Sequence, residues 1–62
     1  MNREERLRNL ILDRYTSLRQ FSLEADIPYS TLLTMLSRGI GGASLDAVML
    51  ICGKLNIDPY EL

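Results

Sequence analysis

The feature that most constrains the fold is Pro28, which follows one short helical pattern and opens another. Proline cannot continue a helix but is well tolerated in the first turn of a new one, so we expect a helix from about residue 28 to 37. The preceding helix opens at Ser17, and only residues 25–27 remain to connect the two. This connection is too tight for a hairpin, and helices joined so closely cross steeply, as in a helix-turn-helix.

The residue types around this connection fit that geometry. The small Ser22 would let the second helix approach the third, and Asp26 can adopt the left-handed conformation that such a turn requires. Ile27 would fill the core beneath the turn. Ser17 and Gln20 have capping-box spacing, in which each side chain satisfies a backbone N–H at the helix start. Spacing alone leaves two interpretations open, a DNA-binding helix-turn-helix and an ordinary corner between core helices.

The remaining patterns predict helices on both sides of this pair. A helix over 3–15 has an apolar stripe, the glycine-rich segment 39–43 forms a loop, and Ser44 caps a fourth helix with Asp46 in its first turn. Residues 58–61 predict the start of a fifth helix. The positions expected to face inward are Leu32, Met35 and Leu36 in the third helix, and Leu45, Val48, Ile51, Cys52 and Leu55 in the fourth. We therefore expect one all-α domain over 1–62, a bundle of four to five helices, with the helix-turn-helix at about 17–38.

Composition excludes several classes of protein. The 62 residues include one cysteine, Cys52, and no histidine, so neither an intramolecular disulfide nor a Cys/His metal cluster can form. No apolar run approaches the roughly 18 residues that span a bilayer, so we expect a cytoplasmic protein. No cofactor motif and no set of catalytic side chains is present, so we expect no enzyme. The net charge of −1 and the pI near 5.1 do not indicate a basic nucleic-acid binder.

A family resemblance adds to this interpretation. The segment Leu18-Arg-Gln-Phe-Ser-Leu-Glu-Ala-Asp-Ile-Pro-Tyr-Ser-Thr-Leu-Leu33, with Leu36-Ser-Arg-Gly39 and residues 42–62, resembles the Xre family of lambda-repressor-like regulators. Within that family it is most similar to a prophage-type subgroup. The resemblance covers roughly residues 7–62 and implies a lambda-repressor-like helical bundle that binds double-stranded DNA. The chain departs from the family pattern at Leu18, Asp26 and Leu36, where the family usually has Gln, Gly and Glu.

The resemblance also implies which residues touch DNA. In this family the third helix lies in the major groove with its N-terminal residues against the base edges. Mapped onto this chain, the helix presents Tyr29, Ser30, Thr31 and Thr34 to the groove. Leu33 would contact a thymine methyl or, equally, a core or dimer partner, and Arg38 would hold a phosphate. Backbone N–H groups near Ser17 would bind another phosphate, with Arg19 adding charge.

Partners follow from the same interpretation. We expect an operator in double-stranded DNA, occupied by a homodimer, with no membrane or small-molecule ligand. Candidate dimer contacts are the leftover apolar residues Ile40, Met49, Leu50, Tyr60 and Leu62, although each could instead pack against its own chain. The alternative function is a helical protein-interaction module, or an antitoxin-type regulator that binds both DNA and a partner protein.

Overall fold

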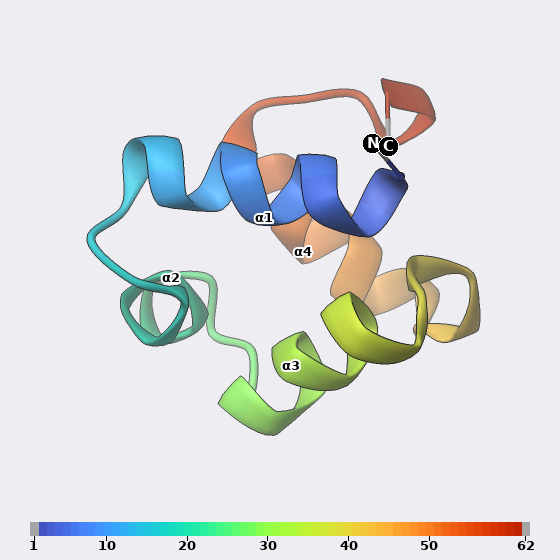
Figure 1. The fold of residues 1–62 in the computed structure, drawn as a ribbon, viewed down its shortest axis with the longest axis horizontal. Helices are drawn as coiled ribbons and strands as arrows, with labels where there is room; N and C mark the ends of the chain where they lie inside the picture. The colour runs from blue at the N-terminus through green and yellow to red at the C-terminus, as the bar shows by residue number, and fades with distance from the viewer. Residues whose placement is uncertain (1, 62) are drawn as a thin grey trace.

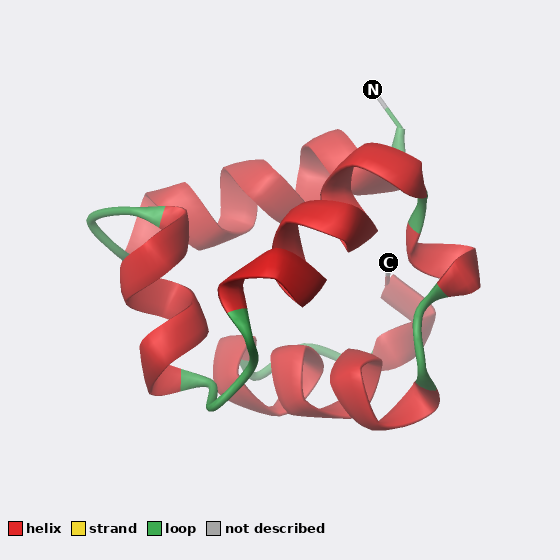
Figure 2. Ribbon diagram, turned by 90° about the horizontal axis from the view of Figure 1, so that it is seen from below, coloured by secondary structure: helices red, strands yellow, loops and turns green. Residues whose placement is uncertain are grey.

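The computed structural model describes residues 2–61 and confirms an all-α fold. Its helices are α1 (Arg3–Arg14), α2 (Leu18–Glu24), α3 (Tyr29–Arg38) and α4 (Leu45–Leu55), with single 3-10 turns at η1 (Ile40–Gly42) and η2 (Pro59–Glu61). Figure 1 shows α2 nearly end-on while α3 runs across the view, so the two helices cross steeply. Seen from below in Figure 2, α3 lies nearest the viewer, between α1 and α4. The helix that the proline opens therefore forms one face of the molecule.

Side-chain caps begin three of the helices. Asn2 accepts a hydrogen bond from the Glu5 backbone N–H at 2.8 Å, and Ser17 accepts from that of Gln20 at 3.0 Å. Ser44 caps α4 by accepting from the Ala47 N–H at 3.2 Å, as predicted. The reciprocal half of the predicted capping box is wrong. The Gln20 side chain donates to Glu24 at 3.0 Å instead, because residues four apart face each other on a helix surface.

Two left-handed residues end α2 and α4 in the same way. Asp26 has φ 59°, which confirms the prediction for the tight turn, and Asn56 has φ 56°. After Asp26, the Ile27 N–H reaches back to the Ser22 carbonyl at 3.0 Å and the Asp26 N–H to the Leu23 carbonyl at 3.3 Å. This is the hydrogen-bond pattern of a Schellman motif, which satisfies carbonyls at a helix end and turns the chain sharply.

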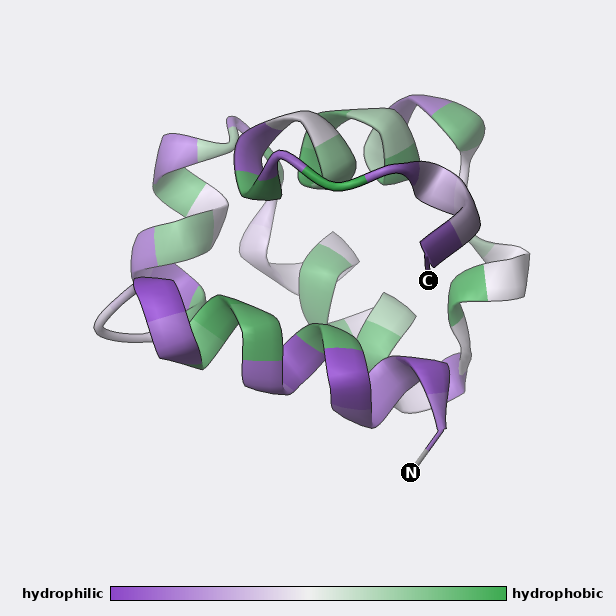
Figure 3. Ribbon diagram, turned by 90° about the horizontal axis from the view of Figure 1, so that it is seen from above, coloured by the Kyte–Doolittle hydropathy of each residue, from purple (hydrophilic) through white to green (hydrophobic). Residues whose placement is uncertain are grey.

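One apolar core joins all four helices. Figure 3 shows the hydrophobic part of α1 turned toward the other helices and its hydrophilic part turned outward. Ile27 inserts beneath the α2–α3 turn, and the rings of Tyr15 and Phe21 pack edge to face with centroids 4.9 Å apart. The Arg14 guanidinium donates to the Leu55 carbonyl and so ties the end of α1 to that of α4. The core side chains are Leu7, Ile11, Phe21, Ala25, Ile27, Leu32, Met35, Leu36, Ile40, Ala47, Ile51 and Leu55.

For the C-terminal half, one prediction is wrong and two open expectations are resolved. Leu45 was expected in the buried stripe of α4, yet it is 74% exposed, because no other element within residues 2–61 covers that side of the helix's first turn; Ala47 is buried instead. Ile40 was a candidate dimer contact but is buried in its own core. The start of a fifth helix, expected at 58–61, is a single 3-10 turn within the described residues, with Asp58 accepting from the Tyr60 N–H at 3.0 Å. The dimer candidate Leu62 lies outside the described residues.

No helix within residues 2–61 has the length and apolar character needed to cross a membrane.

Candidate nucleic-acid interface

The α3 helix divides into a buried and an exposed side. Leu32, Met35 and Leu36 face the core, as the spacing predicts. The opposite side carries short polar side chains and ends in a cation, and its exposed residues are Ser30, Leu33, Thr34, Ser37 and Arg38. Pro28 is the residue before the helix, with φ −57°, rather than its first helical residue. The proline therefore fixes where α3 begins, and the apolar period fixes which side it presents.

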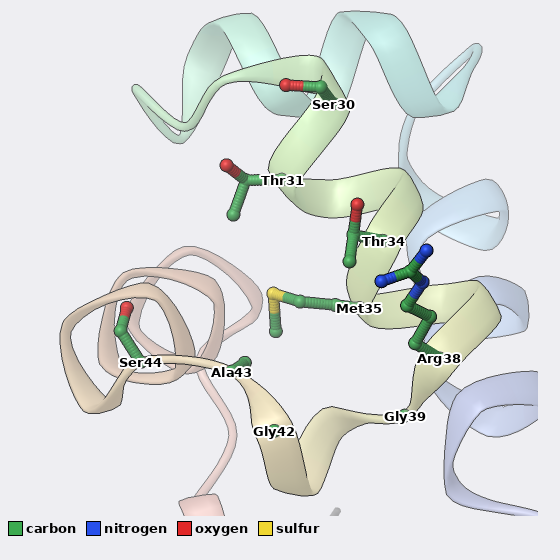
Figure 4. Close-up of a pocket in the computed structure, with 9 residues that line it drawn as sticks. All are labelled: Ser30, Thr31, Thr34, Met35, Arg38, Gly39, Gly42, Ala43 and Ser44. Atoms are coloured by element: carbon green, nitrogen blue, oxygen red, sulfur yellow. The ribbon is translucent and has the colours of Figure 1, made fainter.

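A hollow of about 500 Å³ lies between α3 and the loop that follows it. Figure 4 shows one wall formed by α3 and the other by the segment 42–44, with the Met35 side chain extending between them. The Arg38 guanidinium lies beside Thr34 at one end of the hollow. Hydroxyl groups both donate and accept hydrogen bonds, and a guanidinium donates up to five in a fixed fork. The polar side chains of the lining can therefore bind a phosphate group or the edge of a base.

The first helix of the pair contributes a second cation to this surface. The Arg19 guanidinium lies over the Tyr29 ring, with its central carbon 4.4 Å from the ring centroid. A cation over an aromatic face is attracted by the negative face of the ring. This contact joins the start of α2 to the start of α3 and leaves Tyr29 half-buried. The sequence predicted separate DNA contacts for Arg19 and Tyr29, and the structure stacks the two side chains on each other.

The loop beyond α3 is held by a carboxylate from α1. Gly39 ends α3 with φ 116°, a conformation that residues with a Cβ rarely adopt, and the chain then enters η1. The Glu4 side chain accepts a hydrogen bond from the Ile40 N–H at 3.0 Å. This bond, with one from the backbone N–H of Glu4 itself, lowers the pKa of Glu4 below its usual value of 4.5. An ionised Glu4 therefore fixes one wall of the hollow.

The structure brings six of the eight predicted site residues into two groups. Arg19 and Tyr29 form the stacked pair, and the residues that line the hollow include Ser30, Thr31, Thr34 and Arg38. Leu33 is 39% exposed on α3 but does not line the hollow. Ser17 is exposed at the start of α2, where its hydroxyl is occupied by the cap on Gln20.

Sequence reasoning missed part of the lining. The additional residues are Met35, Gly39, Gly42, Ala43 and Ser44. Met35 was assigned to the core, where it does lie, but its side chain also reaches the hollow. A run of small residues between two helices was the available signal, since such residues let backbone form a wall close to a ligand. That signal shows that a loop is present, not that the loop folds back beside α3.

The thiol of Cys52 takes no part in this surface. It is buried in α4, and burial raises the pKa of the thiol, to which the charges of Asp58 and Glu61 add. Within residues 2–61, no three His, Cys, Asp or Glu side chains come together in a group that could hold a metal ion.

Comparison with models of protein families, with curated proteins and with solved structures finds no match to this chain.

Proposed function

We propose that this chain is a sequence-specific regulator that binds double-stranded DNA with α3 in the major groove. It belongs, in this proposal, to the Xre family that the sequence resembles, and acts as a prophage-type repressor by occupying an operator. The cytoplasm is the compartment in which such a regulator works. Binding is proposed rather than catalysis, because no carboxylate, imidazole or thiol is among the side chains that line the hollow.

The position of α3 is the observation that carries the proposal. It is the second helix of a pair joined by a left-handed residue, and its N-terminal half presents hydroxyls on an outer face of the molecule. In DNA-binding helix-turn-helix proteins the N-terminal residues of the second helix contact base edges. Ser30 and Thr31 hold the corresponding positions, and Thr34 lies one turn further along the helix. Single hydroxyls discriminate weakly between bases, so we expect modest specificity for each subunit.

Charge supports a weak rather than a strong contact with the DNA backbone. Arg38 at the end of α3 and Arg19 at the start of α2 lie on either side of the hydroxyl row, and α3 itself contains no acidic residue. Each cation that neutralises a phosphate releases counterions from the duplex, which makes the affinity fall with salt. With so few cations, a single copy should bind weakly near physiological salt.

A second candidate function is favoured by the same scarcity of charge. The whole chain has a net charge of −1, and Leu33 presents an apolar side chain on the outer side of α3. A surface with few cations and an exposed apolar side chain suits a partner protein, as in an interaction module or an antitoxin. The two functions predict different effects of salt on binding affinity. Affinity for DNA should fall steeply with salt, because only phosphate contacts release condensed counterions.

A salt titration of duplex binding tests the DNA proposal. Fluorescence anisotropy of a random-sequence duplex gives the affinity of the whole chain over a range of salt concentrations, starting low. We expect log affinity to fall linearly with log salt, and Arg38→Ala to reduce the slope by about 0.9 if Arg38 holds one phosphate. Selection of bound sites from a random duplex pool then tests for sequence specificity.

Arg6→Ala is the matched control for Arg38→Ala. It removes the same charge from an exposed position on α1, which does not line the hollow. We expect its slope to equal that of the unsubstituted chain. Absence of any affinity at low salt, or equal effects of the two arginine substitutions, would overturn the assignment of DNA to this face.

A further inference from the structure

The outer side of α4 is apolar and has no partner within the described chain. Its inner side, with Ala47, Ile51 and Leu55, lies in the core. Leu45, Met49 and Leu50 instead lie on the outside, where Leu50 is 47% exposed. A shallow hollow on this side is lined by Asp46, Met49 and Leu50. Met49 and Leu50, which line this hollow together, form an exposed apolar contact surface on α4.

The charges on this side of α4 are arranged symmetrically about Leu50. Asp46 stands four residues before Leu50 and Lys54 four residues after it, and both are exposed. Residues four apart lie on one ridge of a helix, inclined slightly to its axis. With a rise of 1.5 Å per residue, each charge is about 6 Å along the axis from Leu50. Asp46, Leu50 and Lys54 therefore form a ridge, here called the α4 ridge, with opposite charges at its two ends.

We propose that the α4 ridge is a contact between two copies of this chain, related by a two-fold axis that passes beside Leu50. A two-fold axis makes each contact occur twice, with residue i of one copy against residue j of the other and the reverse. Antiparallel α4 helices would then place Leu50 against Leu50. Each Asp46 would face the Lys54 of the second copy.

The pattern of charge selects this arrangement over a parallel one. Parallel α4 helices in register would place Asp46 against Asp46 and Lys54 against Lys54, and like charges in contact are unfavourable. Gly53 lies next to the ridge, and a Cβ built there would meet nothing within 4 Å. The absence of a side chain at Gly53 leaves room for the second helix to approach. The shallow hollow beside Met49 would receive the Leu50 side chain of the second copy.

The size of the surface determines how strong the association can be. With 11 residues, α4 is about 16 Å long, so the contact is well below the roughly 800 Å² per partner of a stable complex. We therefore expect a weak dimer with a dissociation constant on the order of 0.1 mM. The proposed dimer contact does not depend on DNA binding, and it is tested in the absence of DNA.

Exchanging the two charges of the α4 ridge tests the contact. Sedimentation equilibrium measures self-association of the whole chain without DNA, at protein concentrations up to about 1 mM. Asp46→Lys alone places two lysines in contact and Lys54→Asp alone places two aspartates in contact, so each should weaken association at least tenfold. The double variant D46K/K54D restores opposite charges and should return association to within about threefold of the unsubstituted chain. If the single substitutions acted only by destabilising the helix, the double variant would be the weakest.

A matched pair of apolar substitutions locates the contact. Leu50→Glu places two carboxylates at the proposed axis, and we expect it to abolish the dimer. Leu12→Glu makes the same change at a position on α1 that is also 47% exposed, and should leave association unchanged. Thermal unfolding at low protein concentration confirms that each variant folds. A strict monomer at all concentrations, a dimer that survives Leu50→Glu, or failure of the double exchange to restore association would each overturn the proposal.

Discussion

Adjacent leucines on α3 offer a direct test of how the helix is oriented. Leu32 is fully buried and Leu33 is 39% exposed, although both have the same chemistry and neighbouring positions in one helix. Leu32→Ala and Leu33→Ala remove the same atoms and change intrinsic helix propensity equally. Any difference between their effects on stability therefore measures burial alone.

The expected magnitude follows from the burial of each side chain. Truncation of a buried leucine to alanine costs about 2–5 kcal/mol, from lost transfer free energy and the remaining cavity. A 62-residue chain has a free energy of unfolding of about 3–9 kcal/mol in total. Leu32→Ala should therefore remove a large share of the stability and lower the melting temperature by at least 10 °C or so. Leu33→Ala should cost less than about 1 kcal/mol.

Urea unfolding followed by far-ultraviolet circular dichroism measures both free energies. The slope of unfolding free energy with urea should be the same for the two variants, since it depends on the surface exposed on unfolding. Equal losses from the two substitutions, or a larger loss from Leu33→Ala, would refute the assigned orientation of α3. A Leu32→Ala variant with the midpoint of the unsubstituted chain would refute it as well.

Three further predictions concern individual contacts. Because the pKa of Glu4 is lowered by folding, its contribution to stability is present above the unfolded value and is lost as the pH falls through the folded value. The stability difference between the unsubstituted chain and Glu4→Gln should thus be largest at neutral pH and shrink as the solution is acidified; a constant difference would contradict the Ile40 hydrogen bond. A double-mutant cycle of Arg19→Ala and Tyr29→Leu should give a coupling energy of about 0.5–1 kcal/mol, whereas additive effects would exclude the stacked pair. The Cys52 thiol, with its raised pKa, should react with iodoacetamide only as the chain unfolds in urea, and prompt labelling of the folded chain would contradict its burial.

Local chemistry made much of the fold predictable from the sequence. Ser17 and Ser44 cap helices because their short side chains reach a backbone N–H three residues on, which requires no distant partner. Asp26 adopts the left-handed conformation for a reason equally local, since short polar side chains tolerate it. The burial of Leu32, Met35 and Leu36 follows from the helical period.

The wrong prediction for Leu45 depended on what another part of the chain does. Leu45 fits an apolar stripe, but whether a residue on the border of a stripe is buried depends on which element covers it. The Gln20 side chain had two partners within reach, and geometry on the formed helix favoured Glu24. Ile40 could meet a second copy or pack against its own chain, and only the folded loop decides for burial in its own core.

The sequence by itself determined the tight pair of helices that Pro28 separates, because proline, a left-handed Asp26 and an apolar period act within a few residues. It also identified the polar residues of α3. Only the tertiary structure joined Arg19 to Tyr29, and only it closed the hollow by setting residues 42–44 opposite α3. Glu4 holds that loop from a position 36 residues away in the chain. Contacts of this kind follow from how the helices pack around the shared core, which no local pattern specifies.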